Sequence, residues 1–129
     1  MKKLILFLPL FIAGCFLPYM GNGTPSSYKF WVKKDDSLRG QEWRYCSNKA
    51  NEQLDKFQQE LIDEGNKNWS ELYKNKEKYQ MYEDTIKLNS KYLFQCLYKS
   101  GYRFNPPLTW CLAESDNTKI CLENMKYRN

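Results

Sequence analysis

The sequence predicts a mainly α (α+β) domain, an antiparallel helical hairpin with a small antiparallel β-hairpin or sheet, stapled by two disulfides. Two long segments repeat apolar residues at helical spacing, and shorter segments with strand and turn patterns flank them. Five cysteines are present; one follows an N-terminal apolar run, which leaves an even number for pairing. The length of 129 residues suits one small domain.

The first twenty residues have the three parts of an export signal. Two lysines follow the initiator methionine, the uncharged run Leu4–Ala13 comes next, and the small Gly14 precedes Cys15. The alternative is a membrane-spanning helix. The strongly apolar part is only about 15 residues long, whereas about 20 are needed to cross a bilayer, and Pro9 and Pro18 interrupt it. An export signal covering residues 1–14 is therefore favoured.

Ile12-Ala13-Gly14-Cys15 resembles the lipobox of bacterial lipoproteins. The resemblance implies cleavage between Gly14 and Cys15 and a diacylglycerol thioether on Cys15, which becomes the acylated N-terminus. Several acyl chains on one residue would anchor the protein stably in a bilayer. By the sorting rule of these lipoproteins, Phe16 in place of Asp implies the outer membrane, facing the periplasm, with surface display left open. The alternative is an ordinary secretory signal with Cys15 as a spare disulfide partner.

Residues 15–27 are interpreted as the lipidated N-terminus and a flexible tether, because the stretch from Phe16 to Ser27 is rich in Gly, Pro and Ser. Twelve residues could reach about 40 Å at full extension. The domain is expected to occupy residues 28–129. It is expected to begin with a short strand at 28–33, in which Tyr28, Phe30 and Val32 share one face.

Two helices are expected next, the first over 38–64. Its apolar residues are spaced three or four apart, as on one face of a helix: Trp43, Cys46, Ala50, Leu54, Phe57 and Leu61. The second helix starts near Trp69 or Ser70 and ends at Lys99-Ser100-Gly101, before Pro106 and Pro107. Its apolar residues are Leu72, Tyr79, Tyr82, Ile86, Leu93 and Cys96. The segment 108–123 is interpreted as a β-hairpin that could pair with the strand at 28–33.

Four cysteines in an oxidising compartment predict two disulfides, with three possible connectivities. A turn at Ser115-Asp116-Asn117 would place Cys111 opposite Cys121 across the hairpin, leaving Cys46 to pair with Cys96. From the entropy of the closed loops, the Cys111–Cys121 and Cys46–Cys96 bridges are expected to stabilise the folded state by roughly 3 and 4 kcal/mol, respectively. Cys46 and Cys96 are offset by about eight residues in the helical hairpin, roughly 12 Å of rise. Their bridge requires a bent, offset or late-starting second helix.

A second resemblance links the domain to small outer-membrane lipoproteins of Gram-negative bacteria. It rests on Phe30-Trp31-Val32-Lys33, on Trp43 with Cys46, and on Cys96 followed by Leu-Tyr-Lys-Ser-Gly-Tyr102. In that pattern the two cysteines pair, which supports the Cys46–Cys96 bridge. The resemblance implies a cellular location and a disulfide-bonded scaffold but no activity.

The composition argues against several chemistries. The chain contains no His, so no imidazole is available as a general base or metal ligand, and no CxxC spacing predicts a metal site. Adjacent carboxylates lie where helix ends and turns explain them. The formal net charge is +5, or +3 without Lys2 and Lys3, and charges of both signs are interspersed along the chain, so we expect no nucleic-acid binding. We therefore expect neither a metal nor a cofactor, and not an enzyme.

The expected function is that of a membrane-anchored, non-enzymatic lipoprotein of the cell envelope. Its partners would be the lipid bilayer, through acylated Cys15, and another envelope protein that it binds or helps to assemble. One alternative is an inhibitor or immunity-type lipoprotein that neutralises a toxin, phage or host enzyme. Another is a glycan-binding envelope module, since aromatic residues make up 16% of the chain. Most of those aromatics are expected in the core, including Trp43, Phe57, Tyr79 and Tyr82.

Overall fold

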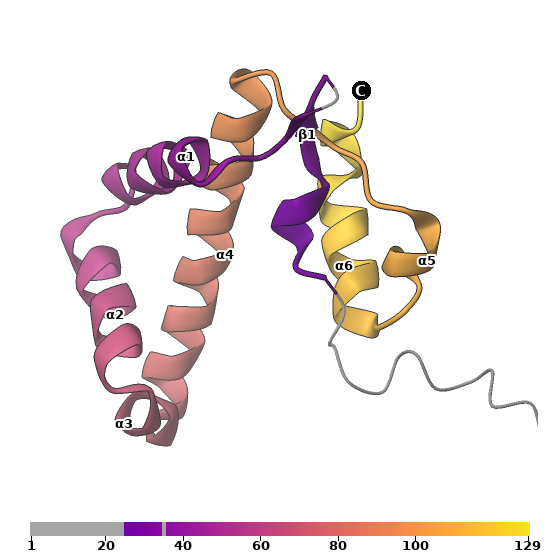
Figure 1. Cartoon of the computed structure of the whole chain (residues 1–129). Helices are drawn as coiled ribbons and strands as arrows, with labels where there is room; N and C mark the ends of the chain where they lie inside the picture. Colours follow the sequence, from indigo (N-terminus) through magenta and orange to yellow (C-terminus); the bar gives the residue numbers. More distant parts are fainter. Residues whose placement is uncertain (1–24, 35) are drawn as a thin grey trace, which may run out of the picture.

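The computed structural model describes residues 25–34 and 36–129 (Figure 1). The predicted signal peptide, Gly14, Cys15 and most of the tether lie outside the described residues. No helix among the described residues is long and apolar enough to cross a membrane. The predicted fold class is confirmed, since helices dominate and one small antiparallel sheet and two disulfides accompany them.

The helices lie in two groups joined by the sheet (Figure 1). The first group is α1 (Gly40–Glu52), α2 (Lys56–Lys67), α3 (Trp69–Lys74) and α4 (Lys76–Lys99). The second group is α5 (Leu108–Cys111), α6 (Ser115–Asn124) and the 3-10 helix η2 (Met125–Tyr127). A further 3-10 helix η1 (Ser27–Phe30) leads into the strands β1 (Trp31–Lys33) and β2 (Asp36–Ser37), and β3 is Arg103–Phe104.

The small sheet has the order β2-β1-β3 and is antiparallel throughout. The predicted strand at 28–33 is therefore shorter than expected, because its first residues form η1. Its buried face is also the opposite of the prediction, since Trp31 is completely buried while Phe30 and Val32 are half-buried. The cause is pairing with β3, which sets Trp31 opposite Phe104 and turns the indole into the core.

The predicted first helix is two helices with a turn between them. Asp55 caps α2 by a capping box: Gln58 N donates to Asp55 Oδ1 at 2.8 Å, and Asp55 N donates to Gln58 Oε1 at 3.0 Å. Leu54 stays buried at the turn, but Phe57 is 54% exposed because α2 does not continue the face of α1. The prediction of Phe57 as a core residue is wrong.

The predicted second helix is also divided, and this division accounts for the disulfide offset. Asn75 ends α3 and caps α4, accepting a hydrogen bond from Lys78 N at 3.1 Å. The long helix therefore starts at Lys76, later than expected. α1 crosses the far end of α4 (Figure 1), and Cys46 pairs with Cys96 at a Cα–Cα distance of 5.5 Å. The bridge that the sequence favoured is present.

The segment 108–123 is helical, so the predicted β-hairpin is wrong. Ser115, Asp116 and Asn117 begin α6 instead of forming a turn, as these residue types favour helix starts as well as turns. Asn117 Nδ2 donates to the Trp110 carbonyl at 3.0 Å, and Thr118 Oγ1 donates to the Cys111 carbonyl at 2.7 Å. Cys111 and Cys121 do pair, at a Cα–Cα distance of 5.8 Å, but between two helices.

Trp31 lies at the centre of the core that joins the two helical groups. Its ring stacks on Phe94 of α4 at 5.2 Å between centroids and contacts Phe104 at 5.4 Å and Tyr127 at 5.7 Å. These partners come from α4, β3 and η2. One side chain thus packs against three elements that are distant in the sequence.

Close packing of α2 on α4 depends on Gly65. A Cβ at this position would collide with the ring of Tyr82, whereas a Cβ at Gly40 would meet nothing within 4 Å. Gly65→Ala is therefore expected to lower the free energy of unfolding by about 1–3 kcal/mol, as overpacking does. Gly40→Ala is the matched control and should leave the free energy of unfolding unchanged or slightly raised. Urea unfolding followed by circular dichroism measures both; equal stability of the two variants would contradict this packing.

Tyr102 gives the stability a dependence on pH. Burial, and next the charge of Glu42, raise the pKa of the Tyr102 phenol above its ordinary value of 10.0. The folded state favours the neutral phenol, so Tyr102 contributes to the free energy of unfolding. This contribution is complete below the ordinary pKa of the phenol and is lost as the pH rises through the raised pKa. Tyr102→Phe should therefore flatten the fall in free energy of unfolding above about pH 10. Urea titrations at several alkaline pH values test this, with exposed Tyr45→Phe as control; an unchanged slope in Tyr102→Phe would contradict it.

Candidate binding cleft

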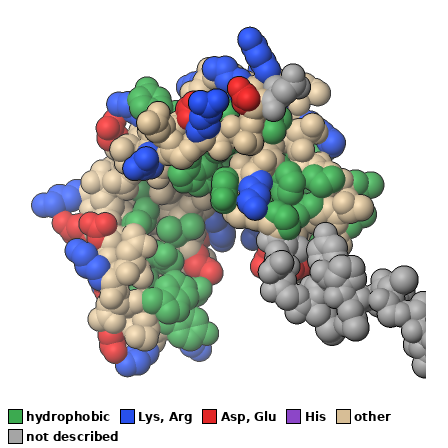
Figure 2. Space-filling view, in the orientation of Figure 1, with side chains coloured by type: hydrophobic (Ala, Val, Ile, Leu, Met, Phe, Trp, Pro, Cys, Tyr) green, Lys and Arg blue, Asp and Glu red, His purple; other side chains and the backbone are tan. Residues whose placement is uncertain are grey.

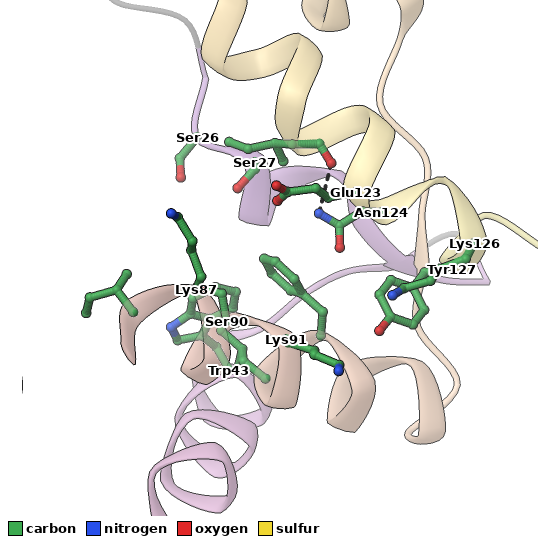
Figure 3. Close-up of a pocket in the computed structure, with 14 residues that line it drawn as sticks. Ser26, Ser27, Trp43, Lys87, Ser90, Lys91, Glu123, Asn124, Lys126 and Tyr127 are labelled. Atoms are coloured by element: carbon green, nitrogen blue, oxygen red, sulfur yellow. Dashed lines mark hydrogen bonds between the residues drawn. The ribbon is translucent and has the colours of Figure 1, made fainter. Parts of the chain in front are cut away.

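A cleft of about 700 Å³ opens between α4 and α6 (Figure 3). Its apolar surface comes from Ile86, Leu93 and Phe94 of α4, from Ile120 of α6 and from Trp43 of α1. Leu93 is buried, while Phe94 and Ile120 are half-buried and pack against the core. A concave, largely apolar site of this size is typical of ligand and peptide binding.

The cleft carries more positive than negative charge. Lys87 and Lys91 of α4 and Lys126 of η2 line it, with Glu123 of α6 as the one acidic lining residue. Lys87 extends toward Ser26 across the cleft in Figure 3. Its contact with Asp84, at 3.5 Å, joins two exposed side chains and is too weak to hold the ammonium group. The cleft therefore suits a partner that is apolar with an acidic edge.

The chain enters the domain beside this cleft. Ser26 and Ser27 line its edge, and the indole Nε1 of Trp110 donates a hydrogen bond to the Pro25 carbonyl at 2.7 Å. Phe30 packs on the same indole, with 4.8 Å between ring centroids. The start of the described chain is thus held against α5 at Pro25 and lies beside the cleft at Ser26 and Ser27.

An aromatic cluster lies at the other end of α4. Trp69 of α3 contacts Tyr79 and Tyr82 of α4 at 5.3 and 5.7 Å between ring centroids, and Tyr73 contacts Tyr79 at 5.1 Å. Trp69 and Tyr73 are 48% and 61% exposed, while Tyr79 and Tyr82 are half-buried. Tyr79 and Tyr82 were predicted in the core. They are only half-buried and form the inner side of a surface cluster.

The acidic residues near this cluster have partners of their own. The Tyr79 hydroxyl donates to Glu83 Oε1 at 3.0 Å, and this hydrogen bond raises the pKa of the Tyr79 phenol. Lys78 Nζ lies 2.6 Å from Glu64 Oε2. No group of three or more Cys, His, Asp or Glu side chains among the described residues could hold a metal ion. Glu83 is thus bonded within α4, and Glu64 joins α2 to α4.

The cleft is a site that the sequence analysis did not predict. Its lining comes from residues 26–27, α1, α4, α6 and η2, so no local pattern contains it. The four cysteines were placed correctly in pairs, and Cys15 and Gly14 lie outside the described residues. No protein-family model, no curated protein and no solved structure matches the chain.

Proposed function

We propose that this chain is a lipoprotein of the bacterial cell envelope that binds another envelope protein without catalysing a reaction. Acylated Cys15 anchors it in the outer membrane, facing the periplasm, and the domain from residue 28 onward, together with Ser26 and Ser27, carries the binding site. The lipobox resemblance at Ile12-Ala13-Gly14-Cys15 supports the address. The two disulfides, which suit an oxidising compartment, support it further.

The observation that carries the binding role is the cleft between α4 and α6. Two helices with an apolar floor between them form the kind of groove that accepts the apolar face of a third helix. Lys87, Lys91 and Lys126 favour acidic residues at the edge of that partner helix. The partner is accordingly an envelope protein with an acidic amphipathic segment.

Binding without catalysis fits the residues of the cleft. Ser26, Ser27 and Ser90 are the serine hydroxyl groups that line it, and a serine needs an adjacent base to act as a nucleophile. The chain contains no His, and among the described residues none of these three serines donates a side-chain hydrogen bond to a lysine or carboxylate that could serve as that base. The described cysteines are all held in disulfides and are not nucleophiles.

Filling the cleft tests this function. Ser90→Trp places a large side chain in the cleft, and Gln80→Trp makes a similar change on the exposed surface of the same helix. Each variant is tagged, cross-linked in cells and purified from detergent-solubilised envelopes, and the captured proteins are quantified by mass spectrometry. We expect the captured amount of one envelope protein to fall about tenfold or more with Ser90→Trp, which corresponds to a loss of about 1.4 kcal/mol or more in binding free energy. Its captured amount should be unchanged with Gln80→Trp. Identical capture by both variants would contradict the proposal.

The aromatic cluster favours a second candidate function, binding of envelope glycans. Exposed Trp69 and Tyr73 offer flat faces of the kind that stack on sugar rings, beside the hydroxyl of Tyr79. Sedimentation with purified peptidoglycan separates the two functions. Retention that is lost in Trp69→Ala but kept in Ser90→Trp would favour glycan binding, whereas no retention removes this candidate.

A further inference from the structure

The hairpin of α5 and α6 exposes four large apolar side chains that the core does not use. Leu108, Leu112, Leu122 and Met125 are 70%, 68%, 71% and 49% exposed. Leu108 and Leu112 are four residues apart on α5 and its C-cap, and Leu122 and Met125 are three residues apart at the end of α6. Each pair therefore lies on one side of its helix. We call these four residues the leucine face; Figure 2 shows hydrophobic side chains on the α5 side of the molecule.

The leucine face is held in a fixed arrangement. The Cys111–Cys121 disulfide joins α5 to α6, and the hydrogen bonds of Asn117 and Thr118 to the backbone of α5 join them a second time. A short helix such as α5 would not be stable alone. The Cys111–Cys121 disulfide thus fixes the exposed leucines relative to one another. The same two helices contribute Trp110 and Cys121 to the core.

The described chain begins at Pro25, against the side of α5 that faces away from Leu108 and Leu112. The indole of Trp110 holds the Pro25 carbonyl at 2.7 Å, and Trp110 is two residues from both Leu108 and Leu112, so Pro25 and these leucines are separated by about the width of one helix, roughly 10 Å. Cys15 precedes Pro25 by only ten residues, a reach of at most about 35 Å. A surface tethered this closely to a bilayer meets it at a high effective concentration, so a weak apolar contact is sufficient.

We propose that the leucine face inserts into the interfacial region of the bilayer that holds the Cys15 lipid. The inference rests on the lipid anchor of the proposed function and adds the orientation of the domain to it. Lys119, three residues before Leu122, flanks the face, and the four residues of the face are themselves uncharged, so the insertion is an apolar contact. The opposite side of α6 lines the cleft, which is thereby held beside the membrane surface and open to a neighbouring envelope protein.

Added tryptophans test the insertion directly. Leu122→Trp places a reporter in the leucine face, and Phe57→Trp places a matched reporter at an exposed apolar position on α2. Each full-length variant is purified from membranes, reconstituted in phosphatidylglycerol and phosphatidylethanolamine vesicles with or without brominated acyl chains, and compared with the unsubstituted protein. The leucine face should lie about 5–10 Å deep, where its side chains meet the brominated acyl chains. The tryptophan fluorescence added by Leu122→Trp should then be quenched by roughly half or more, whereas the fluorescence added by Phe57→Trp should be unchanged.

The two proposals fail in different ways in this experiment. The intact mass of the same samples reports the acyl group, and quenching reports the leucine face. A lipidated protein with no quenching at 122, or with equal quenching at 122 and 57, overturns the insertion and leaves the anchor intact. A protein with no acyl mass overturns the anchor. Cross-linked dimers through position 122, without quenching, would assign the face to a second copy of the chain and also overturn the insertion.

Discussion

Replacing Cys46 and Cys96 together by Ala is expected to lower the free energy of unfolding by about 4 kcal/mol. The bridge closes a loop with a sequence separation of 50, which contains most of α1 and α4 and all of α2 and α3. Without it, the unfolded chain gains the entropy of that loop. Urea unfolding of the double variant, followed by circular dichroism, measures the loss.

The matched control is the Cys111→Ala, Cys121→Ala double variant. Its bridge spans a separation of 10, so the same reasoning predicts a loss of about 3 kcal/mol. Reductant alone is unsuitable because it opens both bridges together. A larger loss for the short loop than for the long one would contradict the entropic account and indicate that α5 and α6 separate without their bridge.

Trp31→Ala is expected to lower the free energy of unfolding by about 3–5 kcal/mol. The side chain is fully buried and contacts Phe94, Phe104 and Tyr127. Its removal leaves a cavity where α4, β3 and η2 meet, so the two helical groups lose their common contact. Thermal unfolding and urea titration measure the effect.

Trp69→Ala is the control for the loss of an indole. Trp69 is 48% exposed, and its partners are the tyrosines of the aromatic cluster. We expect a loss of about 1–2 kcal/mol from these ring contacts, smaller than that of Trp31→Ala. Comparable losses in the two variants would show that Trp31 does not hold the helical groups together.

Helical periodicity predicted the two main helical segments but not their breaks. Leu54 is buried and fits the apolar repeat whether the helix continues or turns, so the pattern could not locate the turn. A local signal was present: Asp55 followed three residues later by Gln58 is a capping box. The prediction for 108–123 was wrong for a related reason, because Ser-Asp-Asn starts helices and also forms turns. Tertiary contacts with Trp110 and Cys111 favour the helix.

Both disulfide pairs were predictable, although the geometry given for one of them was wrong. A short separation favours Cys111 with Cys121 in a hairpin of strands or of helices, and the other pair then follows. The cleft was not predictable, because it requires α6 to lie opposite α4. The leucine face depends likewise on knowing that 108–112 and 115–125 are helical.

A lipid-anchored domain held by two disulfides is tested most directly by the intact mass of the protein extracted from native membranes. Samples are measured with and without reduction, each followed by alkylation. We predict a chain that starts at Cys15, carries acyl mass and gains four alkyl groups only after reduction. A chain without acyl mass, or one whose inner cysteines are alkylated before reduction, would contradict it.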